Sequence, residues 1–478
     1  MEITLRLFEK KHLDRIHQAS LEILETIGII VDHQKILKLL YDAGAKIKDK
    51  KNKIVLFNER LVKEGLRKAP SSFKLSDRAG GYKEIAPGGE TTFWTPCVKN
   101  VFRDGVSKDM SAKDLIDFTR VVDSLENVFG VVGASVSDYP PQVQDFVGFR
   151  LMAEHTYKHL RPIAFAPEGV DAVIEMAQVL VDGGSLRDNP ILSLGHSSVT
   201  PLTWTNLGLE RFYRSRGYGI PISVHAGPLV GGISPVTLAG TLAVANAEVL
   251  AGIALNQLLE EGRPCFYNLG FGRVFDMRTA IGLAGSAEVA LLAAAGSQLS
   301  RYYNLPSAAW SNTESMLVDS QSIYERTMMM LLFILAKINM VWGVGQLESE
   351  ISVSLEQAVI DDEIIGPLKR IQRGIEIDDE TLALEVIKEV GFPLLSAKNY
   401  LDHEHTAKHF KEEMFFPHLS NRKTREDWLA LGGKTLEDRA KERCKEILKA
   451  KKRIYITEKQ KQELLKIEKK YINMLVGS

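Results

Sequence analysis

The chain has 478 residues, long enough for one large α/β domain with extensions or for roughly two to four ordinary domains. Its 60 Lys and Arg balance 61 Asp and Glu, and a net charge of −1 gives no overall electrostatic case for a nucleic-acid or membrane partner. A neutral small molecule or a zwitterion fits this balance at least as well. The three cysteines, Cys97, Cys265 and Cys444, have no paired spacing, which predicts a reducing, cytoplasmic location.

The first 80 residues predict an N-terminal helical extension. Amphipathic patterns run over Leu13–Ile27 and over Gln34–Ala43, the latter ending at Gly44. The N-terminus has acidic residues and no apolar run of signal-peptide length, so we expect it to stay attached. We expect this part to be all-helical.

Residues 81–350 alternate between strand-like and helix-like segments. Helical stretches such as Ala112–Val122 and Ala239–Leu259 separate eight β-type segments: Glu90–Val98, Val128–Ser135, Pro162–Pro167, Ile191–Ser197, Pro221–His225, Pro264–Leu269, Pro306–Trp310 and Met340–Gln346. This alternation is typical of a (β/α)8 TIM barrel, with a doubly wound sheet as the alternative. The chain has neither a GxGxxG after the first strand nor a GxxxxGK[ST] anywhere, which argues against nucleotide binding.

One stretch, Ser223–Leu259, joins a strand, a glycine-rich turn and a nearly uncharged helix. Between His225 and Glu260 only Glu248 carries a full charge, and Ser234 is expected to cap the helix ahead of Pro235. Polar residues and glycines interrupt the helix, which argues against a membrane span. We expect a helix buried under the chain's own layers or under a second subunit, and therefore a homo-oligomer.

Residues 351–478 predict a C-terminal helical region. Acidic, loop-like sequence through Asp361–Glu363 precedes short helices up to Ala397. The segment Glu437–Leu475 is helical and basic, with a capping box at Thr457 and Gln460. We expect a solvated terminal helix, with a docking surface as the alternative.

Active sites of such barrels lie at the C-terminal ends of the strands, so the polar and aromatic residues there are the candidates. Trp94, Tyr267 and Trp310 could form an aromatic box for a cation. The remaining candidates at or just beyond the strand ends are Glu168, His196, His225, Asn268, Asn312, Asp319, Gln346 and Glu348.

Other chemistries have weaker support. His196, His225 and Glu168 could supply three metal ligands, but no HxH, HExxH or thiolate pattern accompanies these residues. The cluster His403–His405 lies beyond the barrel and favours a surface role. There is no GxSxG elbow and no pair of strand-end carboxylates. We therefore assign no metal, no nucleophile and no general acid or base.

Several segments resemble one family over nearly the whole chain. The central one is HAGPLVGGISPVTLAGTLAVANAEVLAGIALNQL, which begins at His225. The others are IHQASLEILETIGIIV followed by LLYDAGAKI within residues 16–47, APSSFKLSDR (Ala69–Arg78), DSQSIYERTMM (Asp319–Met329), VIDDEI (Val359–Ile364) and HTAKHFKEEMFFPHLSNR (His405–Arg422). Together they resemble the trimethylamine methyltransferase-like family of corrinoid-dependent amine methyltransferases.

The resemblance implies a barrel that passes a methyl group from an amine to the cobalt of a separate corrinoid protein. The founding trimethylamine enzymes carry a pyrrolysine, whose place would fall near DSQSIYE, and this sequence has none. The non-pyrrolysine members act on quaternary amines, glycine betaine foremost, with carnitine, proline betaine and butyrobetaine as relatives. The alternatives are another methylated amine such as trimethylamine, a non-catalytic subunit that binds a quaternary amine, and a metal-dependent lyase or hydrolase.

A quaternary ammonium leaves as a neutral tertiary amine, so the protein needs to orient the N–CH3 bond and exclude water without a general acid. Under the resemblance, Trp94, Tyr267 and Trp310 are candidates for the cationic end. His196, His225, Asn268, Asn312 and Gln346 are candidates for the carboxylate end. Glu168, Asp319 and Glu348 are candidates for residues within electrostatic reach of the ammonium. The implied partners are the corrinoid protein and a small quaternary amine, with no nucleic acid and no membrane.

Overall fold

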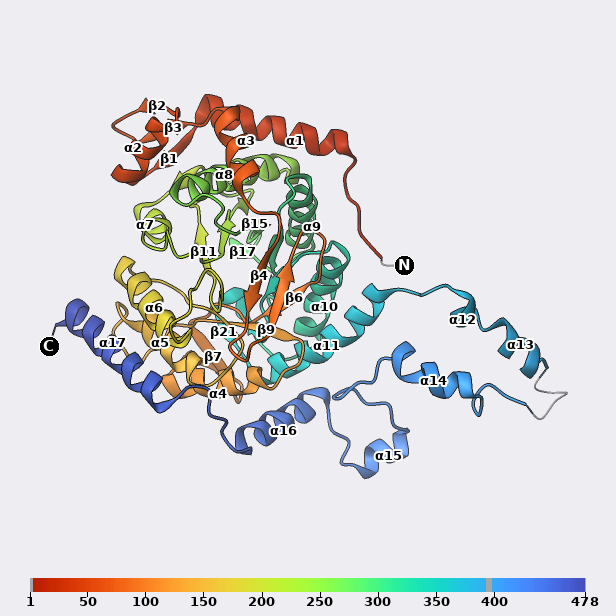
Figure 1. The fold of residues 1–478 in the computed structure, drawn as a ribbon. Helices are drawn as coiled ribbons and strands as arrows, with labels where there is room; N and C mark the ends of the chain where they lie inside the picture. Colours follow the sequence, from red (N-terminus) through yellow and green to blue (C-terminus); the bar gives the residue numbers. More distant parts are fainter. Residues whose placement is uncertain (1–2, 393–397, 478) are drawn as a thin grey trace.

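The computed structural model describes residues 3–392 and 398–477, and at its centre parallel strands form a barrel (Figure 1). The eight-stranded sheet has the order β10-β9-β6-β19-β18-β15-β13-β11, and a parallel bridge between Leu160 and Leu192 closes it. The strands are β6 (Thr92–Trp94), β9 (Val128–Val132), β10 (His159–Arg161), β11 (Leu194–Ser197), β13 (Ile222–His225), β15 (Cys265–Gly270), β18 (Ser307–Trp310) and β19 (Met340–Trp342). The predicted (β/α)8 barrel is confirmed, and the doubly wound sheet is wrong.

A helix follows each barrel strand and packs outside it, as the right-handed βαβ connection requires. Side-chain caps such as Ser111 and Ser286 accept hydrogen bonds from the first turns of their helices. The helices are α4 (Ala112–Asp123), α5 (Gln144–Ala153), α6 (Pro167–Leu180), α7 (Asn206–Arg214), α8 (Leu238–Leu259), α9 (Ala287–Tyr302), α10 (Ser320–Leu335) and α11 (Leu355–Arg373).

Two segments differ from the sequence-based expectation. The third strand lies at His159–Arg161 and not at Pro162–Pro167, where Pro167 instead begins α6. Proline has no backbone N–H for a ladder but suits the first turn of a helix. The acidic run Asp361–Glu363, expected as loop, lies inside α11, and its first carboxylate forms an ion pair with buried Arg326.

Helix α8 is buried by the chain itself. The N-terminal helices α1 (Lys10–Glu22) and α3 (Glu59–Lys68) cover it on one side and β15 on the other (Figure 1). The packing is so close that a Cβ on Gly65 would lie 2.7 Å from the Cα of Ala254. Of the two expectations for α8, burial under the chain's own layers is therefore confirmed, and a homo-oligomer stays a prediction.

By length and composition α8 is the one helix among the described residues that could cross a membrane, but 72% of its most apolar window is buried inside the protein. Its start also differs from the prediction. Thr237 precedes the first helical residue, and Ser234 pairs with Thr241 at 2.8 Å between hydroxyl oxygens and does not cap the helix. The helix is a core element of the barrel wall.

The N-terminal extension contains strands as well as helices. A π-helical turn (Ile23–Ile27) and α2 (Gln34–Asp42) accompany a four-stranded sheet made of β1 (Ile29–Val31), β2 (Lys46–Asp49), β3 (Ile54–Leu56) and β12 (Thr203–Trp204). These strands have two to four residues each, too short for an alternating pattern to show in the sequence.

The hairpin of β4 (Phe73–Ser76) and β5 (Tyr82–Ile85) plugs the N-terminal end of the barrel. Leu75 and Ile85 pack with Trp94 and Met340 inside the barrel. His159 at the start of β10 completes the plug, because its Nδ1 lies 2.9 Å from the carbonyl oxygen of Ser76. Any ligand must therefore enter from the opposite end.

Loops at the C-terminal ends of the strands carry two small sheets. One contains β14 (Leu229–Val230), β16 (Arg273–Asp276) and β17 (Ile281–Leu283). The other contains β7 (Asn100–Arg103), β8 (Val106–Asp109), β20 (Gln346–Leu347) and β21 (Ser352–Val353), with a short 3-10 turn at Glu348–Glu350.

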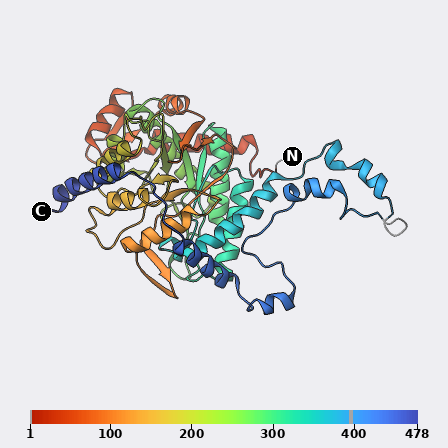
Figure 2. The same ribbon diagram turned by 60° about the horizontal axis from the view of Figure 1, so that its bottom comes forward.

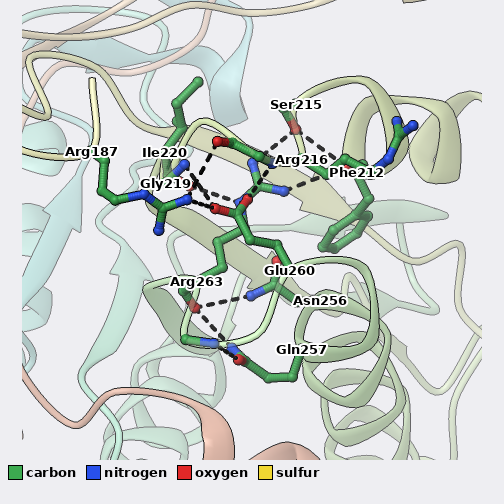
Figure 3. Close-up of polar contacts among 12 residues, drawn as sticks. Arg187, Phe212, Ser215, Arg216, Gly219, Ile220, Asn256, Gln257, Glu260 and Arg263 are labelled. Carbon is green, nitrogen blue, oxygen red and sulfur yellow. Dashed lines mark hydrogen bonds and ion pairs between the residues drawn. The ribbon is translucent and has the colours of Figure 1, made fainter. Parts of the chain in front are cut away.

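At the N-terminal end of β13 and β15, a buried arginine ties two turns together (Figure 3). Arg263 donates from Nε to the Ile220 carbonyl at 2.9 Å and from Nη2 to the Ser215 hydroxyl at 2.9 Å. Glu260 accepts from the Gly219 backbone N–H at 2.9 Å and pairs with Arg187 at 2.6 Å. These contacts lie at the N-terminal ends of the barrel strands, the end of a TIM barrel that serves stability and not catalysis.

The C-terminal region leaves the barrel as an arm and then returns to it (Figures 1 and 2). The arm contains α12 (Asp379–Leu382), α13 (Leu384–Val390), α14 (Glu404–Glu413) and α15 (Arg425–Ala430), and part of the expected helical stretch to Ala397 lies outside the described residues. Helix α16 (Leu436–Lys449) packs on α11 and α4, and α17 (Glu458–Val476) packs on α6. The Thr457–Gln460 capping box is confirmed, but α17 is docked on the barrel, with Glu468 pairing with buried Arg150 at 2.5 Å.

Candidate functional site

Side chains on the barrel strands alternate between the barrel interior and the outer helices. On β15, Tyr267 lies in the outer core with α8, whereas Asn268 contacts His225 inside the barrel. The same alternation turns Trp342 of β19 and Arg161 of β10 inward, where they contact each other. These interior residues meet at the C-terminal ends of the strands, the end opposite the hairpin plug.

Four rings at this end form a closed circuit of contacts, which we call the aromatic quartet: His225, Phe271, Trp310 and Trp342. His225 is stacked on Trp342 with ring centroids 5.2 Å apart, and Trp342 lies 5.6 Å from Trp310. Phe271 closes the circuit, 5.0 Å from Trp310 and 5.6 Å from His225. The quartet is mostly buried, and Phe271 is its most accessible ring.

Arg161 lies against the aromatic quartet as a buried cation. Its guanidinium carbon is 4.3 Å from the ring centroid of Trp342, and Nη2 donates to His225 Nε2 at 3.2 Å. Its Nε has no hydrogen-bond partner, and no described carboxylate forms an ion pair with it. Burial lowers the pKa of Arg161 to about 10, so the side chain is charged at neutral pH.

His225 itself is neutral. Burial, helped by the nearby charge of Arg161, holds its pKa well below the ordinary value of histidine. Its Nδ1 lies 3.1 Å from the side-chain amide of Asn268, whose Oδ1 accepts from the Gly270 backbone N–H at 2.8 Å. Both neighbours, Arg161 Nη2 and Asn268 Nδ2, are N–H donors, and a neutral imidazole accepts a hydrogen bond at one nitrogen only.

An acidic residue approaches the site from the loop after β19. Glu348, Ser349 and Glu350 all have positive φ angles, of 55°, 51° and 79°. Three consecutive non-glycine residues in this region store backbone strain, which proteins keep mainly at functional sites. Glu350 pairs with Arg273 at 2.6 Å and accepts from Asn312 Nδ2 at 3.1 Å, and burial raises the pKa of its carboxyl.

Two amides line the same region with unused atoms. Trp310 donates from its indole N–H to Gln346 Oε1, leaving Gln346 Nε2 without a partner. Asn312 donates to Glu350 and leaves its Oδ1 unpaired. Because buried polar atoms are nearly always satisfied, unpaired ones beside a functional site suggest contacts to a ligand or water.

The loops that carry these groups are held by a buried ion pair. Arg326 and Asp361 are both fully buried and pair at 2.6 Å. Arg326 Nη2 also donates to the Gly343 carbonyl at 2.6 Å, and Asp361 accepts from the Gly345 backbone N–H at 2.6 Å. The DSQSIYER and VIDDEI segments thus meet behind the site and position the loop that leads to Gln346.

Of the predicted site residues, the structure brings His225, Asn268, Trp310, Asn312 and Gln346 together. Tyr267 points away, and its hydroxyl donates to Asn246 of α8 at 2.6 Å. His196 faces α7, with its ring 4.4 Å from Phe212. Both lie one residue out of step with the inward-facing positions of their strands. Trp94 is inside the barrel but nearer the plug, where its indole N–H donates to Thr92 at 2.9 Å and its ring contacts His159.

The three predicted electrostatic residues also lie elsewhere. Glu168 is in the first turn of α6 and pairs with Arg214 at 3.2 Å. Asp319 caps α10, and Glu348 turns to Ser352 at 2.5 Å. Their carboxylates serve local structure.

The three residues proposed as metal ligands do not lie together. His196 faces the outer helices and His225 the barrel interior, and Glu168 is on α6, so the three proposed ligands do not converge. Among the described residues no group of three or more His, Cys, Asp or Glu side chains could hold a metal ion. His403 caps α14 and contacts Glu389 at 3.4 Å in the arm.

Sequence reasoning missed Arg161, Phe271, Trp342 and Glu350. Arg161 ends a strand that was expected three residues later. Trp342 is the third residue of the predicted strand Met340–Gln346 and the last residue of β19, whereas the prediction names Gln346 at the far end of that segment. A period-two count along β19 would have found Trp342, whereas Glu350 depends on a loop conformation that leaves no sequence signal.

Comparison with known proteins places the chain among methyltransferases. The family model for trimethylamine methyltransferase (MTTB) matches residues 2–474. Trimethylamine methyltransferase MttB of Desulfitobacterium hafniense is 31% identical over 453 residues, covering 92% of this chain and 89% of that protein. MttB of Methanosarcina barkeri is 32% identical over 458 residues, covering 94% and 91%. Glycine betaine methyltransferase of Desulfitobacterium hafniense is 29% identical over 426 residues, covering 87% of each chain.

Solved structures agree on the fold. The crystal structure of the hydroxylamine MtmB complex superposes with a TM-score of 0.55 at 13% identity, covering 93% of this chain and 89% of that one. The Methanosarcina barkeri monomethylamine methyltransferase (MtmB) gives a TM-score of 0.51 at 14% identity, covering 91% and 92%.

Proposed function

Because the chain belongs to the trimethylamine methyltransferase family, we propose that it transfers a methyl group from a quaternary amine to the Co(I) corrinoid of a separate corrinoid protein. Glycine betaine is the first candidate substrate, and its product would be dimethylglycine. The related candidates are carnitine, proline betaine and butyrobetaine.

The aromatic quartet carries the choice of a quaternary amine. A quaternary ammonium has no N–H to donate, so ordinary acceptors cannot hold it, and ring faces bind it instead. Trp310 and Phe271, 5.0 Å apart, are the quartet members that Arg161 does not occupy. The Glu350 carboxylate, which accepts from Asn312 and pairs with Arg273, lies in the same region.

The proposed reaction requires no general acid or base from the protein. When docked, the corrinoid supplies the nucleophile as Co(I), and the amine departs neutral. The interior residues of this chain hold the substrate and exclude water, which contributes through orientation. His225 remains neutral and accepts from Arg161, so it is a binding group with no proton to deliver at Nε2.

Because the partner protein carries the corrinoid, the barrel mouth of this chain has to present a surface on which that protein can dock. Loops after β11, β13, β15, β18 and β19 expose large apolar side chains there: Val199, Ile233, Val236, Met277, Ile281, Met316, Leu317 and Ile351. Exposed apolar groups of this kind favour contact with another protein. We name this set the apolar rim and propose that the corrinoid protein docks on it. A homo-oligomer and a cytoplasmic location remain predictions.

The experiment is methyl transfer to the cognate corrinoid protein held as Co(I), followed by the methyl-Co(III) spectrum. Glycine betaine, carnitine, proline betaine, butyrobetaine and trimethylamine are supplied in turn. A response to a quaternary amine supports the proposal. A response to trimethylamine alone would favour the second candidate, which the similarity to the trimethylamine enzymes supports. Binding of a quaternary amine without any spectral change would indicate a non-catalytic subunit.

A further inference from the structure

We propose that Arg161 binds a carboxylate, so that the quaternary amine accepted by this site is a zwitterion with an anionic group a few bonds from its ammonium nitrogen. The inference rests on the proposed function for the identity of the cationic group. The carboxylate contact itself follows from the surroundings of Arg161.

Arg161 is a buried charge with unused hydrogen-bonding capacity. Its residue is 7% exposed, its Nε has no partner, and its one side-chain hydrogen bond is to neutral His225. A buried guanidinium without an opposite charge is costly, and it is normally paired. Every other arginine that is this buried has two or more side-chain bonds: Arg150, Arg263 and Arg326. A bound carboxylate would supply the missing partner in the planar geometry that a guanidinium prefers.

The surrounding chain holds this guanidinium in one place. Trp342 lies beneath it at 4.3 Å, and His225 receives Nη2 at 3.2 Å. Gly195 on the neighbouring strand β11 makes room, because a Cβ there would lie 1.7 Å from Nη2. The arginine is therefore part of a built site and not a mobile surface cation.

A second cation adds positive potential in the same region. Arg211 of α7 has no partner for its Nε, and it acts electrostatically on both Arg161 and Cys97. The acidic group near the site, Glu350, is already paired with Arg273. The end of the site at Arg161 thus attracts anions, and the end at Trp310 and Phe271 offers ring faces to a cation.

The spacing of these two ends limits the substrate. Arg161 contacts Trp342 and His225, and each of these rings contacts the next quartet member, Trp310 and Phe271 respectively. A carboxylate on Arg161 and an ammonium placed against the outer faces of Trp310 and Phe271 are therefore separated by one ring. A short betaine spans that distance, whereas trimethylamine and choline leave Arg161 unpaired and should bind poorly.

The test is calorimetric binding to the full chain, without corrinoid protein. Three ligands separate the two ends: glycine betaine, 3,3-dimethylbutanoate, which keeps the carboxylate but replaces nitrogen by carbon, and choline, which keeps the ammonium but lacks the carboxylate. We expect glycine betaine to bind the wild-type chain at least tenfold more tightly than choline. Arg161→Gln should lower the affinity for glycine betaine and for 3,3-dimethylbutanoate by about 10- to 100-fold and leave the affinity for choline unchanged.

Arg187→Gln is the matched control, because Arg187 pairs with Glu260 at the opposite end of the barrel. This variant should bind all three ligands with wild-type affinity. If Arg161→Gln does not fold, the wild-type comparison of glycine betaine with its methyl ester decides, since the ester lacks the negative charge and keeps the trimethylammonium group. Equal binding of acid and ester, or unchanged binding of 3,3-dimethylbutanoate by Arg161→Gln, would overturn the inference.

This inference and the proposed function can fail separately. Arg161-dependent binding of 3,3-dimethylbutanoate without methyl transfer from any amine would leave the carboxylate contact standing and refute the proposed reaction. Methyl transfer from glycine betaine with an unchanged KM in Arg161→Gln would do the reverse.

Discussion

Gly195→Ala is the smallest change that should disable the arginine at the barrel mouth. The new Cβ would lie 1.7 Å from Nη2 of Arg161 and 2.7 Å from Nε2 of His225. Gly195 has no positive φ, so alanine suits the backbone, and the strain falls on the two side chains.

The geometry sets the size of the effect. An ordinary contact distance is about 3.5 Å, so the guanidinium must move by roughly 1.5–2 Å. That movement breaks the 3.2 Å bond to His225 and shifts the guanidinium from its place over Trp342. Loss of one charge-assisted contact to a ligand is worth about 1.5–3 kcal/mol, or about 10- to 150-fold in affinity. Crowding should also lower the free energy of unfolding by about 1–3 kcal/mol.

The assay pairs calorimetric affinity for glycine betaine with urea unfolding. Gly208→Ala is the control, because it lies in α7 and a Cβ there meets its nearest atom at an ordinary 3.4 Å. It should leave binding unchanged and raise stability slightly, since alanine is favoured over glycine within a helix. Wild-type affinity in Gly195→Ala would refute the placement of Arg161 in the binding site.

Three further predictions concern the site and its support. Asp361→Asn should lower the free energy of unfolding by about 3–5 kcal/mol, because Arg326 stays buried without its counter-charge. In urea unfolding, the double variant Asp361→Leu with Arg326→Met should lose less stability than the two single changes added together. Strict additivity of the two losses would contradict the buried pair. Trp310→Leu should raise KM for the quaternary amine about 5- to 30-fold in steady-state assays, with Trp310→Phe intermediate because it keeps a ring face, and equal KM values in all three would remove Trp310 from the cation end. Burial lowers the pKa of His159 from 6.5 to about 3, so as the pH falls through this range the unfolded chain binds a proton before the folded chain does. The free energy of unfolding therefore falls by up to about 1.4 kcal/mol per pH unit. Between pH 7 and 5 the free energy of unfolding of His159→Asn should depend less steeply on pH than that of the wild type, and an identical slope would contradict the assignment.

The barrel could be predicted from sequence because strands and helices alternate with clear boundaries. Which face of each strand points inward could not. All six residues of β15 are buried, so no polar side distinguishes Tyr267 from Asn268. The same ambiguity turned His196 the wrong way, whereas His225 happened to fall on the interior face.

Other features depend on long-range contacts that a sequence does not display. Helix α8 is apolar all round, which shows that it is buried but not that α1 and α3 of the same chain cover it. Glu350 reaches the site through three consecutive residues with positive φ, a conformation that no residue type in the loop announces. Arg161 was missed because the strand was placed three residues late, beyond its true end.

The central claim is methyl transfer from a quaternary amine, and the most direct measurement follows the methyl group itself. Glycine betaine labelled with 13C in its N-methyl groups is mixed with this protein and the cognate corrinoid protein in the Co(I) state. We predict labelled methyl-cobalt and dimethylglycine in equal amounts, and neither product when this protein is left out. Transfer from trimethylamine but from none of the betaines, in the same preparation, would contradict the account.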